Sequence, residues 1–146
     1  MIKTQQILIS GACLYKESRG KVYWLVVKNG EESDWEIPKA TVRKGESSVR
    51  AILRVLGELA GMTVKVLEEV GRATASTVVN GKPIPQKFLY YLLIHKSSAG
   101  EILGFSEYEW LENAKAIKKL ALKREKGMIR EAKNVLKTWE KIHKVR

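Results

Sequence analysis

Cysteine, proline, phenylalanine and histidine are scarce in this chain, which has one, three, two and two of them among 146 residues. A lone cysteine cannot form an internal disulfide, so we expect Cys13 to be a small buried side chain rather than a nucleophile. His95 has no second ligand at a spacing that suits a metal, so we expect it at the surface. The sequence therefore predicts neither a disulfide scaffold nor a zinc site.

Long apolar runs are missing as well. No stretch is long enough to cross a membrane as a helix, and the first ten residues lack the apolar segment and cleavage site of a signal peptide. A hydrophobic fraction of 45% is ordinary for a globular protein and argues against disorder. We therefore expect one cytoplasmic domain over residues 1–146, with no membrane partner.

Positive charge is abundant and unevenly placed. The formal net charge is +11, and residues 112–146 contribute +8 of it, from 12 basic and 4 acidic residues. Apolar residues in this segment recur at helical spacing, which predicts a C-terminal helix with one face on the sheet and a basic outer face. That outer face is either a solvated surface or a contact for phosphate-rich partners such as RNA.

Periodicity along the chain predicts a mixed α and β fold. Segments of alternating or β-branched residues predict strands over residues 4–15, 22–28, 63–73 and 86–95. Asn80-Gly81 predicts a hairpin tip, with Pro83 and Pro85 at an irregular exit. A helix is expected over residues 112–120, and Gly127 is expected to separate it from the last helix.

The stretch from Trp35 to Met62 predicts an extended segment, a loop and a helix. The residues before Pro38 are extended, because the residue preceding a proline disfavours helical geometry. A loop is expected from Lys39 to Glu46. Ser47 or Ser48 can cap the following helix and Gly61 can end it. Its apolar residues predict a core-facing stripe of Val49, Ile52, Leu53, Leu56, Leu59 and Ala60.

This stretch resembles the Nudix box of the nucleoside-diphosphate-linked hydrolases. The residues that match the family pattern at its spacing are Glu46, Arg54, Leu56, Glu58, Gly61 and Met62. Ala40 stands where the family has its first glycine, and Val55 and Leu59 stand where it has two helix glutamates. Three further segments, 10–15, 86–95 and 104–111, also resemble the family. The resemblance implies a Nudix fold, in which helices sandwich a mixed sheet.

In this family, helix glutamates collect Mg²⁺ or Mn²⁺ and position water against a phosphoanhydride. The resemblance leaves Glu58 and Glu46 as metal ligands and Arg54 as the residue that orients a carboxylate. Two unit charges at about 4 Å and an effective dielectric near 20 interact by roughly 4 kcal/mol, so two lost carboxylates matter. Glu107 or Glu109 is the candidate replacement ligand. Val55 is expected to meet a neighbouring segment or a partner chain.

Phosphate-binding residues are implied by the same resemblance. Lys39 follows the extended lead-in, and the segment 86–95 resembles a strand of diadenosine-polyphosphate hydrolases. There a lysine approaches phosphate and a tyrosine supports the nucleotide, and these roles fall here on Lys87 and Tyr91. The alternative is that Tyr91 faces the core and Lys87 is solvated.

Three functions are compatible with these residues. The first is a binding protein for nucleotides, dinucleoside polyphosphates or RNA phosphates, on a scaffold whose hydrolase site is degenerate. The second is a Mg²⁺- or Mn²⁺-dependent hydrolase of nucleoside polyphosphates. The third is an interaction module with a vestigial pocket, in which Val55 and Leu59 contribute to a homodimer or partner interface.

Overall fold

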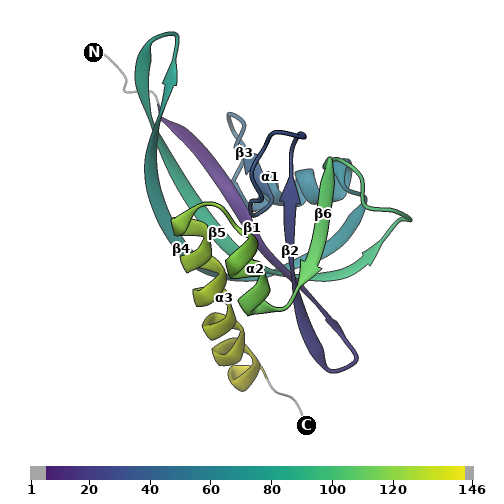
Figure 1. Ribbon diagram of the computed structural model, residues 1–146. Helices are drawn as coiled ribbons and strands as arrows, with labels where there is room; N and C mark the ends of the chain where they lie inside the picture. The colour runs from purple at the N-terminus through teal and green to yellow at the C-terminus, as the bar shows by residue number, and fades with distance from the viewer. Residues whose placement is uncertain (1–5, 144–146) are drawn as a thin grey trace.

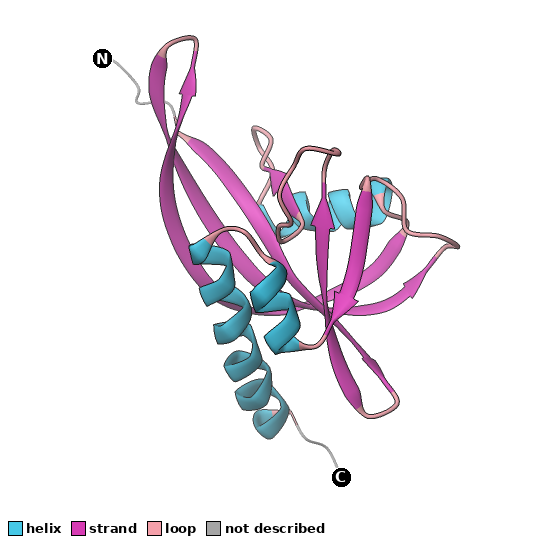
Figure 2. Ribbon diagram, in the orientation of Figure 1, coloured by secondary structure: helices cyan, strands magenta, loops and turns pink. Residues whose placement is uncertain are grey.

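The computed structural model describes residues 6–143 as a mixed sheet with helices on both faces (Figures 1 and 2). The strands are β1 (Ile7–Ser18), β2 (Lys21–Lys28), β3 (Lys39–Thr41), β4 (Met62–Val79), β5 (Lys82–Ser98) and β6 (Glu107–Leu111). The helices are α1 (Ser48–Arg54), which continues into a π-helical turn η1 (Val55–Leu59), α2 (Asn113–Lys119) and α3 (Lys123–Ile142). None of the helices within residues 6–143 is both long and apolar enough to cross a bilayer.

The six strands form one sheet in the order β4-β5-β1-β2-β6, with β3 paired to β1. The β1–β5 pair at its centre is parallel and the other pairs are antiparallel. A parallel neighbour requires a long crossover, and the chain from β1 to β5 supplies it through β2, β3, α1 and β4. The predicted α and β architecture is confirmed.

The β4–β5 hairpin differs from the sequence prediction around its prolines. Its tip is Asn80-Gly81, as expected, and both residues have positive φ, 51° and 78°. Pro83 and Pro85 nevertheless lie within β5 instead of an irregular exit. They precede Gln86, where pairing with β1 begins, so their missing N–H groups remove no bond to β1.

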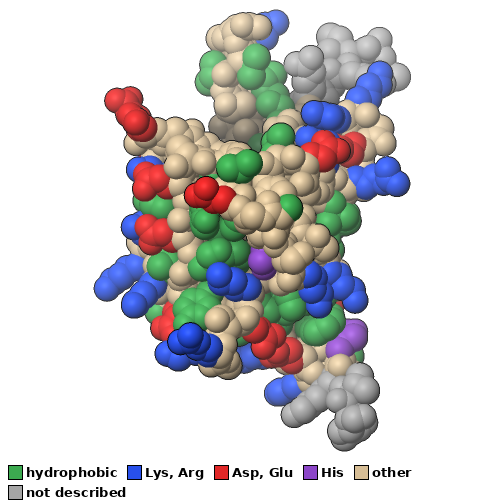
Figure 3. Space-filling view, turned by 90° about the vertical axis from the view of Figure 1, so that its right-hand side faces the viewer, with side chains coloured by type: hydrophobic (Ala, Val, Ile, Leu, Met, Phe, Trp, Pro, Cys, Tyr) green, Lys and Arg blue, Asp and Glu red, His purple; other side chains and the backbone are tan. Residues whose placement is uncertain are grey.

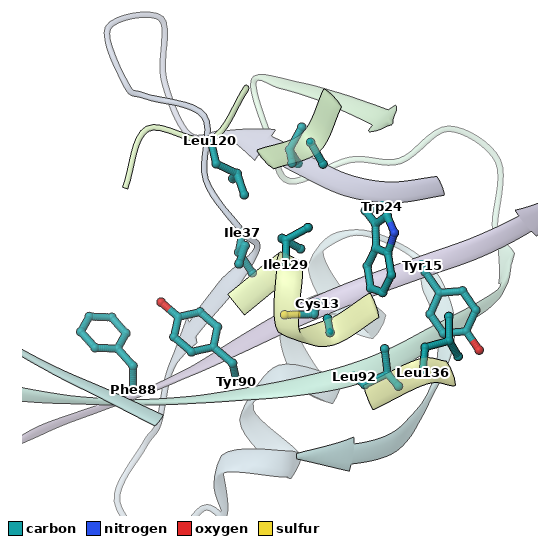
Figure 4. Packing of buried hydrophobic residues seen from close by; sticks show 13 residues of the cluster. Cys13, Tyr15, Trp24, Ile37, Phe88, Tyr90, Leu92, Leu120, Ile129 and Leu136 are labelled. Atoms are coloured by element: carbon teal, nitrogen blue, oxygen red, sulfur yellow. The ribbon is translucent and has the colours of Figure 1, made fainter. Parts of the chain in front are cut away.

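Each face of the sheet carries its own hydrophobic cluster, because successive side chains of a strand point to opposite faces. Cys13 and Tyr15 of β1 belong to the cluster under α2 and α3, whereas Ala12 and Leu14 belong to the cluster under α1. Figure 4 shows the first cluster, with Trp24 near one end. Cys13 is fully buried, as predicted. We name the two surfaces the α1 face and the α3 face.

The two C-terminal helices do not separate at Gly127. Gly127 lies inside α3, and the break falls between Leu120 and Leu122, whose backbones are extended. Leu120 is almost fully buried, so the break lies where the chain packs a side chain into the core. The predicted apolar stripe of α3 is present at Ile129, Ala132 and Leu136, which are buried, but it does not extend to Ile142, which is 72% exposed.

A buried carboxylate joins α3 to the segment that leads into α1. Glu125 is fully buried, and its Oε1 accepts a hydrogen bond from the Ile37 amide at 2.9 Å. Its Oε2 accepts from Lys39 Nζ at 2.6 Å and from the Tyr90 hydroxyl at 3.0 Å. Lys39 Nζ also lies 2.8 Å from Glu36 Oε1. Both oxygens are therefore satisfied, which is the condition under which a buried charge is tolerated.

Removing this carboxylate should strongly destabilise the fold. Glu125→Ala leaves Lys39 and the Ile37 amide without their acceptor, and breaking such a buried pair costs about 3–5 kcal/mol. Glu131→Ala, at an exposed position of the same helix, is the matched control and should change stability by less than about 0.5 kcal/mol. Urea unfolding followed by circular dichroism measures both. Equal stability of the two variants would contradict the structural role of Glu125.

Candidate functional site

The helix of the box segment begins and ends where the sequence predicts. Ser47 is the N-cap, and its side chain accepts a hydrogen bond from the Arg50 amide at 3.1 Å. Gly61 ends the segment with a φ of 67°, a conformation that favours glycine. The predicted loop before the helix is interrupted by β3, which pairs with β1.

The second half of this helix is a π-helical turn. The Ala60 amide donates to the Val55 carbonyl at 3.2 Å, a bond that spans five residues in place of four. The predicted apolar stripe does not hold throughout, and the wider turn accounts for this only at Leu59, because Leu53 precedes the turn. Leu56 is buried, but Leu53 is 37% and Leu59 58% exposed. The prediction that Leu53 and Leu59 face the core is therefore wrong.

Glu46 and Arg54 form a bidentate ion pair within the box segment. Arg54 Nε donates to Glu46 Oε2 at 2.8 Å and Arg54 Nη2 donates to Oε1 at 3.0 Å. Arg54 Nη2 also donates to the Thr41 carbonyl at 3.1 Å, and the Arg43 amide donates to Glu46 Oε1 at 3.0 Å. The bonds from Arg54, then that from Arg43, lower the pKa of Glu46 from 4.5 to about 2. The pair closes the loop onto the helix.

The residues at the three helix-glutamate positions of the family have different environments. Val55 is partly buried and packs against the cluster of the α1 face, as expected for contact with a neighbouring segment. Glu58 and Leu59 are exposed. Glu46, the other predicted ligand, already has both oxygens engaged. Within residues 6–143 no group of three or more acidic, His or Cys side chains is placed to hold a metal ion. The donor set therefore does not fit the family's metal cluster.

Glu107 and Glu109 do not lie near Glu58. The register of β6 with β2 places Tyr108 and Trp110 on the α1 face, so the alternate residues Glu107 and Glu109 point to the α3 face. There Glu109 pairs with Lys119 of α2 at 3.2 Å and Glu107 lies 3.7 Å from Lys28. The structure does not bring either glutamate together with Glu58, because the sheet stands between them.

The predicted phosphate ligands are also separated. Lys39 Nζ donates to the Ile37 carbonyl at 3.2 Å and is paired with Glu36 and Glu125, which accounts for its three N–H donors. Lys87 and Tyr91 lie on the α1 face of β5, in line with the buried Leu93. The structure thus leaves Lys87, and not Lys39, with an ammonium that can reach a ligand.

Tyr91 lies beside the start of α1. Its hydroxyl shares a hydrogen bond with the Ser48 side chain. Between Tyr91 and Lys87, β5 pairs through Leu89 with Ser10 of β1. Ser10 is fully buried, and its hydroxyl has no hydrogen-bond partner in the described part of the chain. A buried hydroxyl without a partner is a cost that a bound ligand or water removes.

Across β5, Arg72 of β4 pairs with Leu89 on the same face and is bonded to Glu69 at 3.0 Å. Arg72 was not predicted from the sequence as a site residue. Arg72 belongs to no motif or helical pattern in the sequence. Only the register of β4 with β5 shows that it lies on the α1 face. Together Lys87, Arg72, Tyr91 and Ser10 form what we call the β5 site.

The Glu46–Arg54 pair predicts a defined pH dependence of stability. Because the folded pKa of Glu46 lies below its ordinary value, its contribution is complete above pH 4.5 and is lost as the pH falls through about 2. In Glu46→Gln the acid-induced loss of unfolding free energy should be smaller than in the parent. Glu32→Gln, at an exposed position, is the control. Thermal unfolding measured between these pH values would contradict the pair if all three proteins lost stability in parallel.

Comparison with known proteins adds structural neighbours but no sequence relatives. No protein-family model matches the chain, and no curated protein matches its sequence. An Ap4A hydrolase of C. elegans, solved as a binary complex, is similar at 21% identity and a TM-score of 0.69, over 90% of this chain and 98% of that one. A NUDIX hydrolase from Nitrosomonas europaea is similar at 15% identity and a TM-score of 0.71, over 90% of each chain.

A third neighbour is the NUDIX domain of Shewanella oneidensis NrtR, solved with ADP ribose. It is similar at 16% identity and a TM-score of 0.65, over 92% of this chain and 90% of that one. All three likenesses span nearly the whole chain and agree with the resemblance carried by the box segment. The protein therefore has the fold of the Nudix hydrolases.

Proposed function

We propose that this protein binds polyphosphate-bearing nucleotides, or the phosphates of RNA, at the β5 site and that its hydrolase site is degenerate. The observation that carries the proposal is the state of the carboxylates around α1 and η1. Glu58 is the one helix carboxylate left at the family positions, and Glu46 is engaged by Arg54. A dication prefers several oxygen ligands in near-octahedral geometry, and these residues do not supply them.

Binding has support on the same face of the sheet. Lys87 and Arg72 supply positive charge on the sheet face that also carries Tyr91, and Ser10 supplies a hydroxyl without a partner in residues 6–143. Cations and aromatic rings recognise the phosphate and the base of a nucleotide. The structural neighbours named for Ap4A and ADP ribose support a nucleotide as the ligand.

The positive charge of α3 supports RNA as a second source of phosphate. Its solvent side presents exposed basic residues, namely Arg130, Lys133, Lys137 and Lys141. Such a face raises affinity for any polyanion in a salt-dependent way. RNA should therefore bind more weakly as salt increases, and nucleotides at the β5 site should respond less.

A Mg²⁺- or Mn²⁺-dependent hydrolase is the alternative function. It is favoured by Glu58 and by the intact Glu46–Arg54 pair, which holds the box loop on the helix. In that case the phosphoanhydride would be cleaved by water, and Glu58 would be indispensable. Measuring binding and turnover on the same samples separates the two functions.

Calorimetry with Ap4A, ADP ribose and a short single-stranded RNA tests the proposal. We expect binding that survives EDTA, and a loss of about tenfold in nucleotide affinity in Lys87→Gln, since a hydrogen bond to a charged group is worth roughly 1.5–3 kcal/mol. Lys82→Gln, at the exposed hairpin tip, should leave nucleotide affinity unchanged. Phosphate release with Mg²⁺ or Mn²⁺ should not exceed that of Glu58→Gln. Metal-dependent release that Glu58→Gln abolishes would establish the hydrolase instead.

Restoring a carboxylate should restore metal affinity. Leu59 is 58% exposed, so Leu59→Glu should change the unfolding free energy by no more than about 0.5 kcal/mol. Adjacent carboxylates at 58 and 59 should then bind Mn²⁺ more tightly than the parent, as measured by electron paramagnetic resonance. Leu59→Gln has the same shape without the charge and should bind no more Mn²⁺ than the parent.

The same variants test the interaction module. If Leu59 contributes to a homodimer, light scattering will show a dimeric parent whose mass is halved by Leu59→Glu. A parent that is monomeric, with unchanged mass in both variants, removes the reason for placing an interface at Leu59.

A further inference from the structure

A hollow of about 370 Å³ lies on the α1 face at the turn end of the β1–β2 hairpin. It is lined by Lys16, Ser18, Arg19, Tyr23 and Trp110. Lys16 pairs with Tyr23, and Trp110 pairs with the buried Leu25. The rings of Tyr23 and Trp110 therefore lie on the α1 face of the sheet. Its volume lies within the range of small-ligand sites, about 300–1,000 Å³.

Two aromatic side chains form the apolar part of this hollow. Trp110 is partly buried, and Lys16 Nζ lies 4.5 Å from the centroid of its indole ring. His95 meets the same indole at 5.2 Å between ring centroids and an interplanar angle of 65°. The His95 ring is itself bonded to the Ser98 side chain at 2.7 Å. The indole is therefore held in one orientation by its neighbours, which lowers the entropy lost when a ligand stacks on it.

The charge of the hollow is positive and uncompensated. Its five lining side chains include two cations and no carboxylate. In the described part of the chain, neither Lys16 nor Arg19 takes part in an ion pair. This differs from Trp35 on the α3 face, where Lys28 and Lys119 also lie over an indole but each pairs with a glutamate.

Arg19 is fixed at the rim by the hairpin turn. It adopts a left-handed backbone conformation with φ of 52°, followed by Gly20 at 77°. Figure 3 views the side of the molecule on which β6 lies in Figure 1, and there basic side chains adjoin hydrophobic ones around a histidine. Aromatic surface beside unpaired cations is the combination that binds a base together with its phosphate.

We propose that this hollow is a second binding site, for a nucleotide unit whose base stacks on Trp110 and Tyr23 and whose phosphates meet Lys16 and Arg19. The unit is supplied either by a free nucleotide or by one residue of a single-stranded RNA. The site does not rest on the function proposed for the β5 site, because the two share no residue.

Nuclear magnetic resonance of the tryptophan indole N–H groups tests this site on the full chain. The Trp110 signal is assigned by its loss in Trp110→Phe, among the signals of the 4 tryptophans. ADP should shift it strongly and pyrophosphate weakly, because pyrophosphate lacks the base. A short RNA that shifts it at lower concentration than ADP identifies a strand as the source, and the reverse order identifies a free nucleotide.

Matched variants locate the response. Lys16→Gln, and Arg19→Asn, which suits the left-handed backbone, should each weaken the Trp110 response about tenfold. Lys82→Gln is the control for lost charge, and Lys87→Gln tests the β5 site; neither should change the Trp110 response. The site is overturned if ADP and RNA leave Trp110 unshifted at millimolar concentration, if pyrophosphate alone gives the full shift, or if Lys82→Gln or Lys87→Gln weakens it equally.

Discussion

The buried Glu125 carboxylate is the contact on which the arrangement around the box segment depends. Glu125 lies on α3, yet its two carboxylate oxygens accept hydrogen bonds from Ile37, Lys39 and Tyr90. These three residues belong to the lead-in to α1, to β3 and to β5. A charge in this position is costly unless every lone pair that faces the protein has a donor. The network therefore permits one relative placement of α3, the lead-in and the central sheet.

This constraint has a consequence for ligand binding. Lys39 is the lysine that the box resemblance places next to phosphate, but its ammonium balances Glu125 and Glu36. If Lys39 turned toward a ligand, it would leave a fully buried carboxylate without its cation. The cations that β5 and β4 offer on the α1 face are Lys87 and Arg72, of which Arg72 is paired with Glu69.

The box segment keeps its scaffold more completely than its chemistry. Its cap, its terminal glycine and the Glu46–Arg54 pair are all present, and these hold the loop on the helix. The carboxylates that would gather a dication are replaced by Val55, which packs into the core, and by Leu59, which faces solvent. The difference between this retained scaffold and the replaced carboxylates is what supports the proposed binding function.

The sequence by itself determined the features that depend on near neighbours. The spacing of the box, the cap at Ser47, the end at Gly61 and the tip at Asn80-Gly81 are set by residues a few positions apart, and all are present in the structure. The basic outer side of α3 follows from helical periodicity alone. These are local preferences of backbone and side chain, so a reading of the chain in order can find them.

Only the tertiary structure decided which distant groups meet. Helical spacing alone could have predicted that Glu125 is buried, because it lies four residues before Ile129 on the buried stripe. Its partner Lys39, however, is 86 residues away in the sequence. Strand register placed Glu109 on the face opposite Glu58, because a shift of one residue reverses a side chain's direction. The π-helical turn exposed Leu59 through one added residue per turn. Each of these outcomes depends on packing between segments far apart in the chain, which local spacing does not encode.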